Sequence, residues 1–457
     1  MQYVADLHLH SKYSRAVSPQ MVLPVMSEWA IKKGIDILAT ADWTHPLWSR
    51  HLKEELEEDG EGLFKVKNSS SKFKSEKKDP LFILSTEISS IYSQGGKTRR
   101  IHNLIFAPSL GTVEKINKEF LRRSFNLASD GRPIIGLSAK DLLELVLTID
   151  KEAILIPCHA WTPWFSLYGS MSGFDSIEEC FGKYSKFIFG VETGLSSDPV
   201  MNWRIKELKN KAILSSSDSH SPAKMGREAT VFELEKPTFK NIRRAILGPS
   251  LKPNWSKLPD RIDYTIEFYP EEGKYHYTGH RNCRVVQSPK ETKEKGPICS
   301  VCKKGLTVGV MHRVEQLAKK EDAFVEEIDP NGVKWITDPS GNHPKYVNLV
   351  PLLEIVAESL GRPVSSVRTK EVYENICKNL GPELDILLNI SIDEISIIAG
   401  EKLAEGVRKV RQRDIVIKPG FDGEYGVVKI WNSDGEQAEE PLTGKQLKSK
   451  DQLRLDF

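Results

Sequence analysis

The sequence has few of the features that mark secreted, membrane or strongly basic proteins. Its six cysteines are too few and too unevenly spread over 457 residues for a disulfide scaffold, which favours the reducing cytoplasm. It shows no basic segment followed by an apolar run at its start and no stretch long enough to span a bilayer, so we expect neither export nor membrane association. The 65 Lys and Arg residues nearly balance the 63 Asp and Glu residues. Any surface for a nucleic acid must therefore be local.

Up to about residue 252, short apolar runs alternate with helix-like segments, which predicts an α/β architecture. Several of these runs end in a polar or ionisable residue. They are "GIDILATAD", "PLFILSTE", "RIHNLIFAP", "AILIPCHA", "FIFGVETG" and "KAILSSSDSH". Because strand ends build the active sites of parallel α/β barrels, we expect these exits to meet at one site.

Changes in composition predict three domains. Residues 1–252 form the α/β domain, residues 253–345 hold a cysteine-containing module, and residues 346–457 form an α-helical domain that binds DNA. In the last, "VNLVPLLEIVAESLG", "VRTKEVYENICKNLG" and "SIDEISIIAGEKLAEGVRKVRQRD" read as amphipathic helices with glycines where they stop. Residues 54–80 are acidic, then basic and serine-rich, and we predict a mobile surface insertion there.

Histidines and carboxylates gather at the predicted strand exits. "ADLHLHSKYSRA" places His8 and His10 on the same face of a strand, since alternate side chains of a strand point the same way. Any one histidine is more often structural than a metal ligand, but the whole set suits zinc, manganese or iron. Magnesium is a further candidate for the active-site ions. The predicted metal ligands are His8, His10, Asp42, His45, Glu87, His102, His159, Asp218 and His220. A metal cluster that binds phosphate and activates water would hydrolyse a phosphoester.

A second ligand pattern follows in the middle of the chain. His280 and Cys283 have the same two-residue gap as Cys299 and Cys302. This spacing predicts one structural zinc ion, because four protein ligands leave no open position for water.

The first region resembles the PHP family of metal-dependent phosphoesterases in "DLHLHS", "TADWTH", the "STE" glutamate, "PCHA" and "SDSH". The resemblance implies a distorted seven-stranded barrel with two or three divalent ions at the strand ends. It implies that His8, His10 and Asp218 hold one ion, that Glu87 bridges, and that His102 and His159 hold a second. His220 and the loop from Asp42 to His45 would face a third. "SKYSRA" lacks a histidine usual in three-metal members, and Trp43 stands where a histidine is usual.

Nearly the whole chain is similar to the endonuclease Q family, through "EEGKYHYTGHRNC", "LTVGVMHRVEQLA" and "PGFDGEYG". The resemblance implies a DNA repair endonuclease that cuts 5′ of deaminated bases (hypoxanthine, uracil, xanthine) or of abasic sites. The damaged nucleotide would be extruded, and metal-activated water would attack with Asp218, Glu87 and His159 in catalytic roles. Damaged DNA is the expected partner. A sliding clamp is a further candidate, although "KDQLRLDF" at the C-terminus has no clear clamp-binding motif.

Aromatic and basic residues are candidates for contact with DNA. They are Trp43, Trp161, Trp164, Phe165, Tyr168, Arg99, Arg100, Arg227, Tyr275, Tyr277, Arg281, Arg408, Lys409 and Arg411. Each also has an ordinary explanation, namely core packing for the rings and a solvated face for the charges.

Two other functions stay open on the sequence alone. The PHP motifs equally fit a small-molecule phosphatase, although nearly half of the chain lies beyond the barrel. A non-catalytic DNA-binding scaffold is the other alternative, against which the complete ligand set argues.

Overall fold

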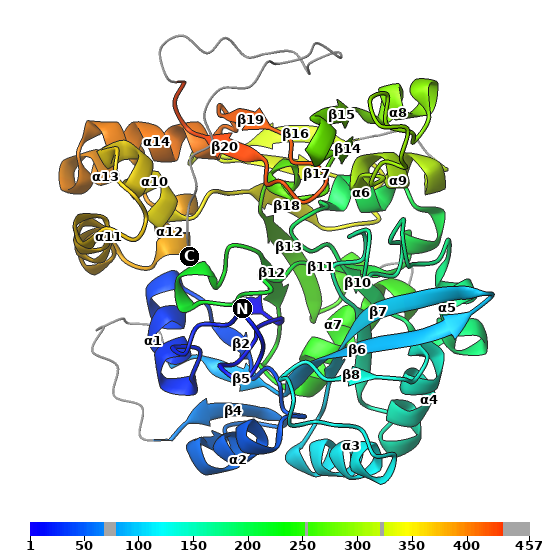
Figure 1. Ribbon diagram of the computed structural model, residues 1–457. Helices are drawn as coiled ribbons and strands as arrows, with labels where there is room; N and C mark the ends of the chain where they lie inside the picture. The colour runs from blue at the N-terminus through cyan, green and yellow to red at the C-terminus, as the bar shows by residue number, and fades with distance from the viewer. Residues whose placement is uncertain (68–78, 252–254, 320–323, 433–457) are drawn as a thin grey trace.

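The computed structural model describes residues 1–67, 79–251, 255–319 and 324–432. A barrel of strands and helices occupies the first half of the chain. A group of C-terminal helices and a small module around strands β14 and β15 lie on opposite sides of its upper end in the view of Figure 1. Within the described residues, no helix combines the length and the apolar character needed to cross a membrane.

The barrel is built from the predicted apolar runs. Its strands are β1 (Gln2–Asp6), β2 (Ile37–Ala39), β5 (Leu81–Ile83), β6 (Ser85–Gln94), β7 (Lys97–Phe106), β8 (Ile134–Ile135), β9 (Ile154–Pro157), β10 (Gly190–Glu192), β11 (Ala212–Leu214) and β12 (Ala229–Glu233). The short strands β2, β9 and β11 are buried at every position. Apolar residues suit them because both faces of such a sheet are covered.

The strands follow one another around a nearly closed circuit. Strands β1, β2 and β5 pair in parallel, β6 continues β5, and β7 pairs antiparallel with both β6 and β9. Ala160 after β9 donates to the carbonyl of Glu192, and β10 pairs in parallel with β11. The hydroxyl of Thr230 in β12 bonds to both backbone groups of Ser215, and β12 pairs antiparallel with β1. The predicted distorted barrel is confirmed, and the antiparallel strands β7 and β12 are its main distortion.

Helices cover the outside of this circuit: α1 (Leu23–Lys33), α2 (Pro46–Glu55), α3 (Leu110–Arg122), α4 (Ala139–Ile149), α5 (Ile177–Phe181), α6 (Pro199–Trp203) and α7 (Phe239–Leu251). Their ends follow the local sequence. Ser138 caps α4 by accepting a hydrogen bond from the backbone of Asp141, and α1 stops at Gly34, whose φ of 84° is left-handed.

The barrel sheet continues across the predicted boundary at residue 252. Strand β13 (Arg261–Glu267) pairs antiparallel with β12, and β18 (Lys345–Asn348), β17 (Lys334–Thr337) and β16 (Val325–Ile328) follow in order. The middle region therefore adds strands to the barrel as well as carrying the cysteines. The division into three domains stays a prediction.

The prediction of a mobile insertion at 54–80 is wrong for its first part. The chain there forms β3 (Leu56–Glu58) and β4 (Leu63–Val66), an antiparallel pair joined to β5. The side chains of Leu56, Leu63 and Phe64 are buried, because the pair lies against the barrel helices. Residues 68–78 of the insertion lie outside the described residues.

The rest of the middle region contains β14 (Thr278–His280), β15 (Val285–Gln287), α8 (Pro289–Lys295) and α9 (Val310–Leu317). The C-terminal helices are α10 (Leu352–Leu360), α11 (Val367–Leu380), α12 (Glu383–Leu388), α13 (Ile392–Ala399) and α14 (Glu401–Arg411), followed by the hairpin β19 (Val416–Lys418) and β20 (Val427–Lys429). The predicted helix stops are confirmed at Gly361 and Gly381, both with positive φ. The third predicted helix is instead divided at Gly400, whose φ is also positive, into α13 and α14. The C-terminal "KDQLRLDF" lies outside the described residues.

Candidate active site

Glu87 lies at the centre of a buried cluster of histidines at the barrel mouth. Its carboxylate is 3.2 Å from Nε2 of His10, 3.2 Å from Nε2 of His159 and 2.5 Å from Nδ1 of His102. Nε2 of His8 is 3.6 Å from Oε2 of Glu87, the oxygen that also faces His10. A carboxylate reached by imidazoles from several strands fits a bridging position between ions.

Asp218 closes the cluster from the loop after β11. Its Oδ1 atom is 3.0 Å from Nε2 of His10 and 3.6 Å from Nε2 of His8. The ring of His220 is 4.7 Å from the ring of His10. Six predicted ligands are therefore brought together around Glu87, although their roles as ligands stay predictions.

The backbone is strained where it delivers these side chains. Asp42, His159 and Asp218 have φ values of 42°, 31° and 46°, a left-handed conformation that non-glycine residues rarely adopt. Gly194 makes room for His159, because a Cβ at that glycine would lie 2.4 Å from the histidine Cβ. Backbone strain of this kind is typical of functional sites, where the surrounding structure holds it in place.

One predicted position differs in the structure. His102 lies inside β7 instead of at a strand exit, directly opposite Ser89 of β6. Since β7 runs antiparallel to its neighbours, the start of "RIHNLIFAP" faces the mouth and its end does not. The apolar run was recognised correctly, but the direction of the strand depends on a pairing that sequence does not show.

Asp42 and His45 also differ from the prediction. Asp42 lies behind His10, 3.3 Å from its Nδ1, and its other oxygen accepts hydrogen bonds from the backbone and hydroxyl of Ser11 and from Ser14. His45 is buried against Tyr13, with ring centroids 4.4 Å apart, and burial lowers its pKa. Asp42 thus orients His10. Among the described residues, His45 belongs to no group of side chains whose ligand atoms are close enough to share one ion.

Three residues of the site were not singled out from the sequence. Glu192 lies 3.0 Å from Nδ1 of His8, Arg132 donates to Glu87 at 3.0 Å, and the Sγ of Cys158 lies 3.7 Å from Glu87. Glu192 ends the strand in "FIFGVETG" and Cys158 stands in "PCHA", so the strand-exit signal was present for both. Arg132 comes from a loop without such a signal.

Charges within the cluster reinforce one another. Burial alone would raise the pKa of Glu87, but the charges of Arg132 and His102 hold it well below its usual range. Burial opposes the charged form of His8, yet the carboxylates of Glu192 and Asp218 raise its pKa well above the ordinary value. The buried carboxylates and imidazoles at the centre therefore interact strongly with one another, and Arg132 places a cation beside Glu87.

The donors fit divalent metal ions. Three buried donor atoms have no hydrogen-bond partner: Nε2 of His8, Nε2 of His10 and Oδ1 of Asp218. Both Nε2 atoms lie near the carboxylates of Glu87 and Asp218. Glu192 and Asp42 occupy the opposite ring nitrogens, which leaves each Nε2 free to point inward. A carboxylate behind the histidine is the usual arrangement at metal sites.

A hollow of about 490 Å³ opens beside the cluster. It reaches His102, His159 and Asp218 at one end, and its walls include Trp164, Phe165 and Tyr275. Arg100 also lines it, with its guanidinium 5.6 Å from the ring of Phe165. These four predicted contact residues therefore share one surface with the histidines.

The other predicted aromatic contacts in the barrel are wrong. Trp43, Trp161 and Tyr168 are buried in the core. The indole of Trp161 donates to Asn202 and stacks on Tyr168, whose hydroxyl donates to Glu207. These rings pack into the core and present no surface to a ligand.

Three of the predicted basic contacts are also structural. Arg99 is buried over the ring of Phe174 and donates to the carbonyl of Gly173. Arg227 donates twice to the carbonyl of Ser217, which fixes the loop before Asp218. Arg411 is buried and donates to the carbonyls of Ile386 and Leu387 in the last turn of α12. Arg99 and Arg411 are therefore buried away from DNA, whereas Arg227 is only half-buried and its contact with DNA stays a prediction.

The remaining predicted contacts lie at or near the surface. Arg281 and Arg408 are exposed, Lys409 is 2.6 Å from Asp414, and Tyr277 is half-buried with its ring stacked on His276. Nothing in these contacts prevents Arg281 or Arg408 from meeting a phosphate.

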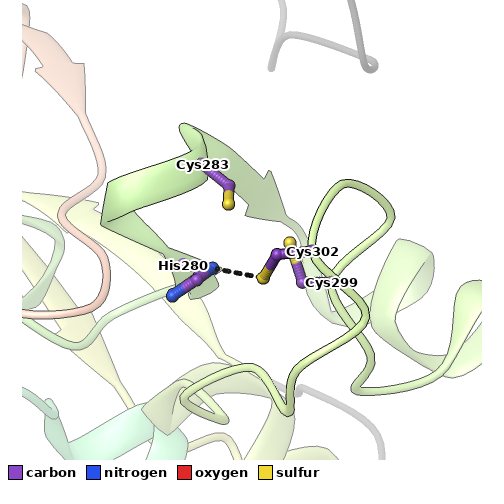
Figure 2. Close-up of side chains that lie close together, drawn as sticks. All are labelled: His280, Cys283, Cys299 and Cys302. Atoms are coloured by element: carbon purple, nitrogen blue, oxygen red, sulfur yellow. Dashed lines mark hydrogen bonds between the residues drawn. The ribbon is translucent and has the colours of Figure 1, made fainter.

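The second predicted cluster is brought together around β14 and β15. The side chains of His280, Cys283, Cys299 and Cys302 converge on one small space (Figure 2), with candidate ligand atoms within 4.8 Å of one another. Nδ1 of His280 is 3.4 Å from Sγ of Cys302. The backbone N–H of Cys302 lowers the pKa of the Cys299 thiol to about 6, which favours the thiolate. This four-residue set fits a closed zinc site.

The fold and the cluster define an α/β barrel protein with histidines and carboxylates gathered at the barrel mouth, extended by a cysteine-containing segment and C-terminal helices. The structure is similar to that of the lesion-specific endonuclease of Pyrococcus furiosus, with a TM-score of 0.77 and 29% identity over 94% of this chain and 95% of that one. It matches equally well a structure of endonuclease Q in complex with a 27-mer duplex that has an abasic lesion at the active site, over 94% and 96% of the two chains. The predicted resemblance to the endonuclease Q family is confirmed over nearly the whole chain.

Two sequence relatives match more than half of the chain. Protein YqxK of Bacillus subtilis is 26% identical over 93% of this chain and 98% of its own length. Protein MJ0043 of Methanocaldococcus jannaschii is 32% identical over 60% of this chain, a match that spans 31% of that longer relative. The family model for the MJ0043 C-terminal domain matches residues 351–414, which are helices α10 to α14.

Proposed function

We propose that this chain is a DNA repair endonuclease that uses divalent metal ions to cut a damaged strand. The cut falls on the 5′ side of a deaminated base, such as hypoxanthine, uracil or xanthine, or of an abasic site. The observation that carries the proposal is the position of the histidine and carboxylate cluster at one end of an aromatic hollow, in a chain that matches endonuclease Q over nearly its full length.

Residues His8, His10, Glu87 and Asp218 would hold one ion, and Glu87, His102 and His159 a second, with His220 facing a third position. Two or three zinc, manganese or magnesium ions bound there would act as Lewis acids towards a phosphate oxygen. They would also lower the pKa of bound water, which supplies a hydroxide nucleophile near neutral pH. Glu192 and Asp42 would keep the histidine rings in the tautomer that leaves Nε2 free. The zinc held by the cysteine cluster would be structural.

The hollow would receive the extruded nucleotide. Trp164, Phe165 and Tyr275 offer ring faces and edges for stacking, and Arg100 at the same surface offers a cation for a phosphate. A damaged or mispaired nucleotide costs less to unstack than a paired one, which gives selectivity before any atom of the base is read. The scissile phosphate of a nucleotide in this hollow would lie next to His102, His159 and Asp218, which surround Glu87.

The variant Asp218→Asn tests the role of the cluster. It removes a metal-binding charge without changing the size of the side chain, so we expect nicking to fall by at least ~100-fold while duplex binding stays close to wild type. Asp141→Asn, at an exposed position of helix α4, is the matched control and should retain full activity. Full nicking by Asp218→Asn would refute the proposed centre. Hydrolysis of a nitrophenyl phosphate monoester without nicking of any duplex would favour a small-molecule phosphatase.

A further inference from the structure

A second hollow, of about 390 Å³, lies on the cysteine-containing module. Its walls come from three parts of the chain. These are the barrel loop with Trp164, the turn between His280 and Cys283 (the knuckle) with Arg281 and Asn282, and the segment with Asp422 and Gly423. A volume of this size falls within the range of roughly 300 to 1,000 Å³ that is usual for ligand sites.

The walls of the second hollow are fixed by hydrogen bonds. The carboxylate of Asp422 accepts from the backbone of Arg281 at 2.8 Å and from the hydroxyl of Thr307 at 2.5 Å. The backbone of Gly423 donates to the carbonyl of Lys274 at 2.9 Å. These bonds join the segment of Asp422 and Gly423 to the cysteine-containing module and to Lys274, which lines the first hollow. The second hollow is therefore preformed.

Trp164 and Tyr275 line both hollows. Their rings meet edge to face, with centroids 5.6 Å apart, so the pair forms a partition between the two spaces. A nucleotide in the first hollow and a base in the second would contact opposite surfaces of the same aromatic pair.

The second hollow also holds unused polar groups. Within the described part of the chain, the side chains of Arg281 and Asn282 are exposed and make no hydrogen bond or ion pair, although both line the hollow. Arginine and asparagine side chains are well suited to hydrogen bonds with base edges, and the ring pair offers stacking. A small acidic or purely apolar ligand would leave part of this lining unpartnered.

We propose that the second hollow binds an undamaged nucleobase of the same substrate while the damaged nucleotide occupies the first. This inference rests on the proposed endonuclease function. The base comes either from the position opposite the lesion, where extrusion removes its pairing partner, or from the position next to the lesion on the cut strand. In both cases the chemistry is that of one unstacked base that meets Asn282 and the aromatic partition.

The variant Asn282→Ala tests the inference, with Asn375→Ala on helix α11 as the matched exposed control. Binding is measured with chelator present, on hypoxanthine duplexes that carry the fluorescent base 2-aminopurine opposite or next to the lesion. In wild type we expect the fluorescence of one of these two duplexes to change on binding, which identifies the base. Asn282→Ala should abolish that change and weaken binding of the lesion duplex at least about fivefold, without affecting an undamaged duplex.

The possible outcomes separate the two proposals. Equal affinities and equal fluorescence changes for Asn282→Ala and Asn375→Ala, with wild type still nicking the hypoxanthine strand, would overturn the second base site alone. A wild-type protein that nicks no damaged duplex would instead overturn the function on which it rests. The zinc content of Asn282→Ala must match wild type, because loss of the metal would weaken binding through unfolding of the knuckle.

Discussion

The substitution Lys33→Met removes the cation of a buried ion pair that joins the barrel to the C-terminal helices. Nζ of Lys33, in the last turn of α1, is 3.0 Å from Oε1 of Glu383 at the start of α12, and their side chains are 0% and 3% exposed. Glu383 also accepts from the hydroxyl of Tyr373 at 2.8 Å and from the backbone of Leu352 at 3.2 Å. Methionine keeps nearly the same length and volume, so the substitution isolates the charge.

The expected loss follows from the charge that is left behind. Removal of one partner from a buried pair commonly costs about 3–5 kcal/mol. The two remaining hydrogen bonds lower this figure. Protonation of an ordinary glutamate at pH 7 costs roughly 3.7 kcal/mol, which sets an upper limit because the variant can escape the unpaired charge in that way. We expect a loss of about 2–3.5 kcal/mol in the free energy of unfolding, and a smaller loss as the pH falls towards 4.

Urea unfolding followed by circular dichroism measures this loss. Lys32→Met is the matched control in the same helix, since Lys32 is 3.2 Å from Glu374 and that carboxylate side chain is 61% exposed. Exposed pairs contribute about 0–1 kcal/mol, so the control should shift the midpoint little. Equal shifts for the two variants, or a loss at Lys33 that does not depend on pH, would refute the assignment of the stabilisation to the buried charge pair.

The remaining predictions concern the site and the pH dependence of stability. Glu192→Gln should lower metal affinity and nicking by about 10–100-fold, because His8 loses the carboxylate on its Nδ1; titration of nicking rate against manganese checks this, and an unchanged metal requirement would contradict it. Cys299→Ser should release one zinc equivalent and lower the thermal midpoint, because a structural zinc contributes to folding directly; metal analysis showing zinc still bound would exclude the four-residue site. Burial, with the nearby charge of Glu354, raises the pKa of Glu272 to about 7. The folded state then binds an extra proton between the unfolded pKa, about 4.3, and pH 7, so this contribution to stability is present at low pH and is lost as the pH rises through 7. The free energy of unfolding of Glu272→Gln, relative to that of wild type, should therefore increase between pH 6 and pH 8. Denaturation measurements that give the same difference at both pH values would show that the Glu272 carboxyl is charged throughout.

The barrel and most of the histidine cluster could be predicted because local sequence carries both. Short buried strands require apolar runs, and in every strand that runs in the common direction of the barrel the residue after the run is delivered to the mouth, with β7 as the exception. His8, His10, His159 and Asp218 follow this logic, and the structure brings them together with Glu87. The two-residue gaps of the cysteine cluster are equally local.

The roles that depend on long-range packing could not be predicted. "HAWTPWFSLYG" contains four aromatic residues with similar local surroundings, yet Trp161 and Tyr168 pack into the core whereas Trp164 and Phe165 line the hollow. The sequence predicts Arg411 on an exposed basic helix face, but the side chain is buried and bonds to carbonyls in the last turn of α12. Burial of this kind is decided by distant segments that meet only in the folded chain.

The central claim is tested most directly by cleavage of a labelled duplex that carries a single hypoxanthine, beside the same duplex without it. The account predicts one cut immediately 5′ of the hypoxanthine, which requires manganese or magnesium and disappears both with chelator and in Asp218→Asn. Equal cutting of the undamaged duplex, or a cut that survives chelator, would contradict it.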